Sequence, residues 1–204
     1  MRQSQLTQSE FVVEQPVCYR YALVPRSGDF ADWKQGRTLA SFDWTDQGAF
    51  AGDKKLAQVW LALARERDEA EPVEPARAPE TPFAVRVQVG PPHGRQPVLG
   101  NLVKGVFDGV VCAFQAHTDT AVLPQVLERL ATVLPADPSE IEELLLDQRR
   151  AVLGVVPRLV SPYRAGVKWD PADHLCVAGE LLAAEPEPVD RHWAIRGEIV
   201  ELSS

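Results

Sequence analysis

Two short segments of the sequence carry residue types that bind metal ions. His117 and Asp119 stand two positions apart, and Asp170 and Asp173 are followed directly by His174. Imidazole nitrogens and carboxylate oxygens are common ligands of divalent metals in proteins. The two segments together are consistent with one metal site. The alternative is a pair of solvated loops, in which the aspartates cap a turn around the proline that follows Asp170.

The densest basic stretch of the chain has the composition of a phosphate-binding surface. It contains Arg149, Arg150, Arg158, Arg164 and Lys168, together with the aromatic residues Tyr163 and Trp169. Cationic side chains neutralise phosphates, and aromatic rings stack on bases. Arg158, Arg164 and Lys168 are therefore candidate nucleic-acid-binding residues. The alternative is an ordinary solvated basic face.

Other familiar motifs for chemistry are missing from the sequence. It has no glycine-rich phosphate-binding loop, no nucleophile elbow and no clustered zinc-ligand spacing. Cys18, Cys112 and Cys176 are odd in number and far apart, which argues against both a disulfide framework and a thiolate zinc site. We expect the cysteines to be buried as small apolar side chains.

The charge and hydropathy of the chain limit its partners. The formal net charge of -8 repels a phosphate backbone at long range, so nucleic-acid binding requires a local basic patch. No stretch approaches the roughly twenty apolar residues of a membrane helix, and the polar first ten residues lack the apolar core of a signal peptide. We expect a cytoplasmic protein with no membrane partner.

The hydrophobic pattern predicts alternating strands and helices in a single domain. Strands are expected at residues 17–24, 38–44, 83–89, 151–156, 175–182 and 193–202, and helices at residues 53–67, 99–116, 123–134 and 137–146. The strand at 83–89 alternates strictly and is expected at the centre of the sheet. The helix at 99–116 should then pack on it through Val103, Val106, Phe107 and Val110.

Composition divides the predicted domain, residues 1–204, into a core and two additions. The core is expected to comprise residues 11–64, 81–116 and 150–202. Residues 65–80 mix charge, alanine and proline, which is typical of an exposed linker. Residues 117–149 are expected to be an inserted helical segment, whose two helices either cover the core or bind a partner.

The helix predicted at 99–116 carries a recognisable set of polar residues. Asn101 is followed by Leu102, by Lys104 and, four positions later, by Asp108. This register resembles the signature helix of the RusA-type Holliday-junction resolvases, which begins Asp-x-Asp-Asn-Leu. Residues 169–177 are similar to the family's second motif, a turn with acids that leads into a strand. The resemblance covers roughly half of the chain, in pieces.

The sequence departs from that family where the chemistry is done. The resemblance implies a dimeric nuclease that cuts branched DNA with magnesium held by an acidic cluster, which includes both acids of the Asp-x-Asp. Val98 and Gly100 stand at those two positions, and neither offers an oxygen ligand. About fifty residues also separate the two motifs, where the family has a short connection. The retained Lys104 and Asp108 have a structural alternative as a surface ion pair.

We therefore expect an α/β fold with a mixed or mostly antiparallel sheet packed by helices, that is, a RusA-like core with an inserted helical segment. The leading hypothesis is a catalytically degenerate RusA-like protein without a cofactor, which acts as a binding or assembly subunit in a nucleic-acid-processing or phage-related system. Lys104 then joins the candidate nucleic-acid-binding residues. The family's dimeric habit implies a homodimer or a complex with a protein partner.

Two other functions stay open. The first is a metal-dependent endonuclease of branched DNA, in which Mg²⁺ is held at a relocated site by Asp108, Asp170, Asp173 and His117. The second is a protein-interaction module unrelated to DNA. The position of Asp108 relative to Asp170 and Asp173 bears on the choice between the degenerate protein and the endonuclease.

Overall fold

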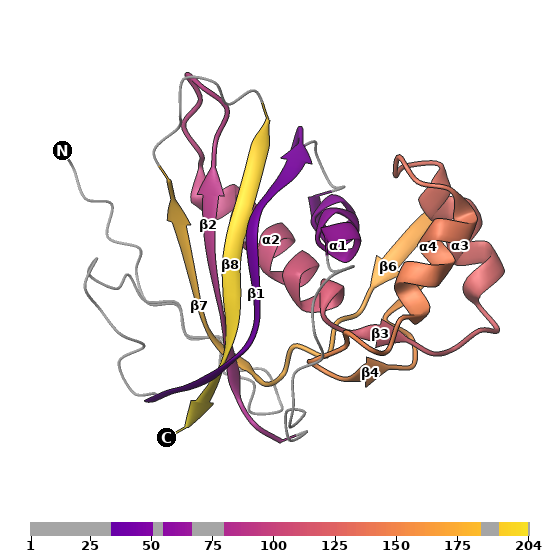
Figure 1. The fold of residues 1–204 in the computed structure, drawn as a ribbon. Coiled ribbons are helices and arrows are strands. Elements are labelled where there is room, and N and C mark those ends of the chain that lie inside the picture. Colours follow the sequence, from indigo (N-terminus) through magenta and orange to yellow (C-terminus); the bar gives the residue numbers. More distant parts are fainter. Residues whose placement is uncertain (1–33, 51–54, 67–79, 185–191, 204) are drawn as a thin grey trace. The chain divides into compact units, whose positions relative to one another are not determined.

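Four long strands form a mixed sheet, and helices pack on it (Figure 1). The computed structural model describes residues 34–50, 55–66, 80–184 and 192–203. In chain order the elements are β1 (Lys34–Gly48), α1 (Lys55–Glu66), β2 (Phe83–Gly90), α2 (Leu99–Ala113), β3 (Ala116–His117), α3 (Leu123–Ala131), α4 (Pro138–Leu146), β4 (Val155–Val156), β5 (Val160–Tyr163), β6 (Gly166–Trp169), β7 (Cys176–Ala183) and β8 (Trp193–Ser203). Among these helices, none is long and apolar enough to cross a membrane.

The main sheet has the strand order β1-β8-β2-β7. Strand β2 runs parallel to β7 and antiparallel to β8. Arg37 contacts Glu201 and Asp46 contacts His192, so β1 and β8 also run antiparallel. The predicted mixed sheet, with the strand at 83–89 in an interior position, is confirmed.

The alternation of β2 separates an apolar face from a charged face. Val85, Val87 and Val89 are buried in the core, as the sequence pattern predicts. Arg86 lies on the other face, between Glu180 of β7 at 3.5 Å and Glu198 of β8 at 3.3 Å. The helices therefore pack on the valine face, and the row of ion pairs crosses the opposite face.

Helix α2 packs on both the sheet and α1. Val106 and Val110 are fully buried, whereas Val103 and Phe107 are half-buried. The ring of Phe107 lies against Gly179 of β7, where a Cβ atom would overlap it. The predicted register of α2 on the sheet is thus correct for the two valines at the centre of the helix.

Two glycines set the distance between α1 and α2. A Cβ atom on Gly105 would stand 2.9 Å from the Cβ of Lys55, and one on Gly109 would stand 2.6 Å from the Cβ of Val59. Such spacings are shorter than atoms tolerate, so the crossing requires residues without side chains at these two positions. Gly105 and Gly109 are four residues apart, so they lie on the same face of α2.

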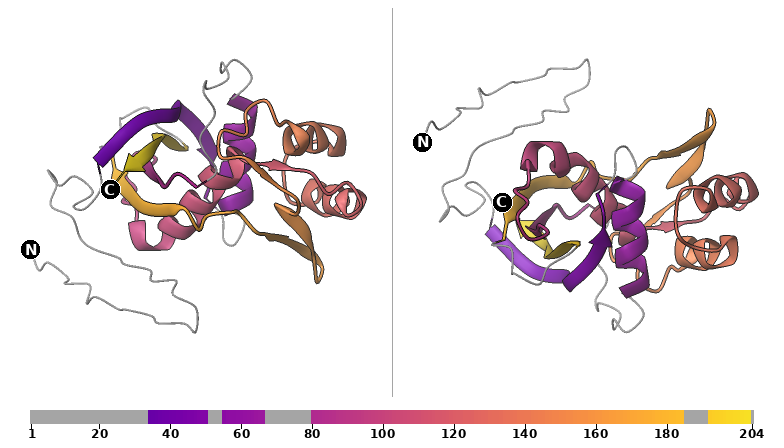
Figure 2. Two further views of the ribbon diagram at one scale, coloured as in Figure 1. Left: turned by 90° about the horizontal axis from the view of Figure 1, so that it is seen from below. Right: turned by 90° about the horizontal axis from the view of Figure 1, so that it is seen from above.

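A third group of elements lies beyond α1 and α2, away from the sheet (Figures 1 and 2). Helices α3 and α4 lie in the segment that the sequence predicts to be helical and bury one apolar side, which comprises Leu123, Val126, Leu127, Leu130, Ile141 and Leu145. Arg65 at the end of α1 holds α4 through Glu140 at 2.6 Å. Because the chain's own core covers these side chains, the helix pair does not offer them as a dimer interface.

Several predicted boundaries differ from the structure. Residues 151–154 form turns, and only 155–156 form a strand, which pairs with β3 in a separate sheet. The expected linker begins inside α1, since Arg65 and Glu66 are helical. Its residues 67–79 lie outside the described part of the chain, as does the strand predicted at 17–24. The β5–β6 hairpin was not predicted, because Pro162 and the glycine after Ala165 look like loop signals.

Candidate functional site

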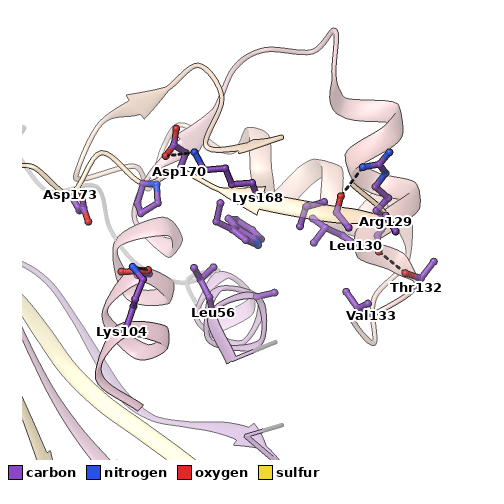
Figure 3. Close-up of a pocket in the computed structure, with 16 residues that line it drawn as sticks. Leu56, Lys104, Arg129, Leu130, Thr132, Val133, Lys168, Asp170 and Asp173 are labelled. Atoms are coloured by element: carbon purple, nitrogen blue, oxygen red, sulfur yellow. Dashed lines mark hydrogen bonds and ion pairs between the residues drawn. The ribbon is translucent and has the colours of Figure 1, made fainter. Parts of the chain in front are cut away.

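A cavity of about 670 Å³ opens between α1, α2, α3 and the β6 strand (Figure 3). Its charged and hydroxyl lining residues are Lys104, Asp108, Arg129, Thr132, Lys168, Asp170 and Asp173, and its apolar lining includes Leu56, Leu130, Val133, Val167 and Trp169. The three aspartates and the two lysines in this lining are residues that the sequence singled out. The fold therefore brings together side chains from two segments that are about sixty residues apart.

Helix α2 contributes a lysine and an aspartate one turn apart. Lys104 Nζ donates to Asp108 Oδ2 at 2.7 Å. The Lys104 side chain is 86% exposed, whereas that of Asp108 is 17% exposed. Solvent screening limits such a pair to a few tenths of a kcal/mol. The lysine is accessible to a ligand, and the aspartate forms part of the wall.

The acidic turn before β7 is held against the end of α2 by a buried amide. Gln115 Nε2 donates to the carbonyl oxygen of Ala172 at 3.0 Å, and the backbone N–H of Ala172 donates to Gln115 Oε1 at 3.2 Å. This two-point contact fixes the turn that carries Asp170 and Asp173. Asp170 in turn forms an ion pair with Lys168 Nζ at 3.3 Å, as Figure 3 shows.

Two cysteines lie within the electrostatic field of these aspartates. Burial raises the pKa of the Cys112 thiol well above its ordinary value, and the charges of Asp108, Asp173 and Asp170 raise it further. Burial, followed by Asp173 and Asp108, raises the pKa of Cys176 to about 12. Besides burial, the carboxylates raise the pKa of both thiols because a negative charge opposes formation of the thiolate.

The Cys176 thiol gives a pH-dependent test of this arrangement. In a Cys18→Ser background, alkylation of Cys176 should be slow at pH 8 and accelerate toward pH 12, because only the thiolate reacts. Asp173→Asn removes a negative charge, so it should lower the thiol pKa and speed alkylation at pH 8. Mass spectrometry of the Cys176 peptide measures the rate of alkylation. Glu143→Gln on α4 is the control. An equal rate in the aspartate variant would contradict the placement of Asp173.

Aromatic packing supports the floor of the cavity. Trp169 packs at a tilt of 46° against the fully buried Trp60 of α1, with ring centroids 5.2 Å apart. Arg129 of α3 donates to the carbonyl oxygen of Gly166 at 2.7 Å and ties the hairpin to the helix. The cavity walls are thus fixed to the core at two points.

Three sequence-predicted residues lie elsewhere. His117 is fully buried, with Nε2 2.9 Å from the Asp119 carbonyl oxygen, and its Nδ1 accepts from the Val160 N–H at 3.4 Å. Both ring nitrogens are therefore engaged, and neither points to a metal site with the aspartates. Arg158 pairs with Asp119 at 2.6 Å. Arg164 lies at the tip of the hairpin and does not line the cavity.

The two positions that the resemblance aligns with the RusA family's metal-binding acids lie at the open start of α2. Val98 is 65% exposed, and a Cβ atom on Gly100 would meet nothing within 4 Å. These positions are accessible to solvent but supply no oxygen ligand. A magnesium ion at the three aspartates would have to displace Lys104 from Asp108 and Lys168 from Asp170, so the present pairing does not fit such an ion well.

Sequence reasoning missed two parts of the site. Gln115 carries no signal in one sequence, because a buried glutamine and an exposed one look alike. Strand β6 could have been predicted from the alternation of exposed and half-buried residues at 166–169, but a run of four residues is a weak signal.

Comparisons with family models, with curated proteins and with solved structures found no match to this chain. The RusA resemblance therefore depends on the residues of α2 and of the turn before β7.

Proposed function

We propose that this chain is a catalytically degenerate RusA-like protein that acts as a binding or assembly subunit in a nucleic-acid-processing or phage-related system. One observation carries the proposal. Lys104 and Asp108 share a cavity with the acidic turn before β7, while the exposed start of α2 has Val98 and Gly100 in place of carboxylates. The cavity keeps lysines that can contact phosphate, and the start of α2 lacks the two carboxylates that the resemblance assigns to a metal ion.

The proposal includes a homodimer or a complex with a protein partner. Since α3 and α4 bury their apolar side within the chain, the interface is expected elsewhere on the surface. Light scattering at several concentrations tests this part independently of any nucleic acid.

The test of the function combines binding and cutting. The protein should bind branched, duplex or single-stranded DNA without cutting it when magnesium or manganese is added, and calorimetry should detect no tight site for either metal. Binding should weaken steeply with salt. In the Lys104→Ala and Lys168→Ala variants, the slope of log K against log salt should fall by about 0.7–0.9 for each phosphate that the variant no longer neutralises.

The endonuclease is the second candidate, because Asp108, Asp170 and Asp173 line one cavity. Metal-dependent cutting that disappears in both Asp108→Ala and Asp173→Ala, but persists in Glu143→Gln, would replace the degenerate function by this one. If neither binding nor cutting occurs, the interaction module unrelated to DNA becomes the better proposal.

A further inference from the structure

The β5–β6 hairpin is a basic segment within an acidic protein. Residues 158–169 include Arg158, Arg164 and Lys168 and contain no acidic residue, whereas the whole chain has a net charge of -8. Arg158 and Lys168, at the base of the hairpin, pair with Asp119 and Asp170. Arg164 stands at the tip, and no acidic partner is seen for it within the described ranges.

The register of the hairpin gives it two different faces. Val160 pairs with Trp169 and Pro162 with Val167, and this apolar face packs toward Trp60 and the core. Ser161 pairs with Lys168 and Tyr163 with Gly166, so these residues share the other face. Tyr163 is 51% exposed there, so its ring is accessible to a ligand.

The tip places a cation beside that exposed ring. The Arg164 guanidinium carbon lies 5.2 Å from the centroid of the Tyr163 ring. Arg164 also has a φ of 50°, a left-handed conformation that favours glycine at this position of a two-residue turn. The chain thus keeps an arginine where glycine fits better, and it holds the arginine against an exposed aromatic ring.

We propose that the hairpin tip binds single-stranded nucleic acid, with Tyr163 stacking on a base and Arg164 contacting an adjacent phosphate. This inference rests on the proposed function and specifies the form of nucleic acid. A single strand exposes the faces of its bases, whereas a duplex buries them between neighbouring pairs. Lys168 on the same face continues the contact toward the cavity, where Lys104 also lies.

Fluorescence anisotropy with a labelled single strand and with the matched duplex tests this inference on the full chain. Tyr163→Ala should weaken single-strand binding about 5- to 100-fold, and duplex binding should change little. Arg164→Gly should flatten the salt dependence for the single strand by about 0.7 in the log–log slope. Because glycine suits the turn, this variant should keep the thermal midpoint of unfolding, so its loss of affinity is not a loss of folding. Arg95→Ala, which changes an exposed arginine outside the hairpin and outside the basic stretch, is the control.

The outcomes separate the two proposals. If the parent protein binds single strands and both hairpin variants bind equally well, the hairpin inference is wrong and the proposed function stands. Equal weakening for single strand and duplex would also overturn it, because stacking then plays no part. If the parent protein binds no nucleic acid, both proposals fail.

Discussion

Replacing Gly109 with leucine is expected to lower the free energy of unfolding by about 3 kcal/mol. A Cβ atom at this position already falls 2.6 Å from the Cβ of Val59, and the rest of the leucine side chain has no space between α1 and α2. The two helices must separate, and the separation exposes buried side chains of both, including Trp60. Chemical denaturation measures the change.

Gly100→Leu is the matched control for this prediction. It lies on the same helix, but a Cβ atom there meets nothing within 4 Å, so the substitution should change stability by no more than about 0.5 kcal/mol. Gly109→Ala should lower the free energy of unfolding by an amount between those of Gly100→Leu and Gly109→Leu. Similar stabilities for the Gly100 and Gly109 variants would show that α1 and α2 do not cross closely at Gly109.

Introducing two carboxylates at the start of α2 is expected to create a divalent metal site. In the double variant Val98→Asp/Gly100→Asp, manganese affinity measured by calorimetry should rise at least about 100-fold, which is about 2.7 kcal/mol. Both positions are open to solvent, so aspartates fit without repacking. Hard cations bind oxygen ligands, and the two new carboxylates would lie two positions apart at the exposed start of the helix.

A charge-matched control separates a built site from general attraction. Val155→Asp/Leu182→Asp adds the same two charges at exposed apolar positions elsewhere. If it gains as much affinity as the α2 variant, the alignment of Val98 and Gly100 with the family's acids is wrong. The gain in the α2 variant should persist when Asp108→Ala is added, because Asp108 lies about 12 Å further along the helix than Gly100.

The elements with strong periodicity were predictable from the sequence. The strict alternation at 83–89 and the apolar spacing of the helices depend on which side chains are buried, and burial repeats with the geometry of each element. The short strands could not be predicted from the sequence, because strands such as β3 and β4 have two residues each, and two residues show no periodicity. The interior position of β2 could be predicted from its alternating valines. The sequence did not predict which strand pairs with β2 in parallel, and the structure shows that it is β7.

The sequence by itself determined the candidate chemistry: which acids and lysines are available, and that Val98 and Gly100 cannot hold a metal ion. Only the tertiary structure decided which of those residues meet. It brings Asp108 to the turn of Asp170 and Asp173, because Gln115 binds the backbone of that turn, and it buries His117 in the core. Contacts between segments far apart in the chain depend on packing and hydrogen bonds in three dimensions, and these leave no local pattern in the sequence.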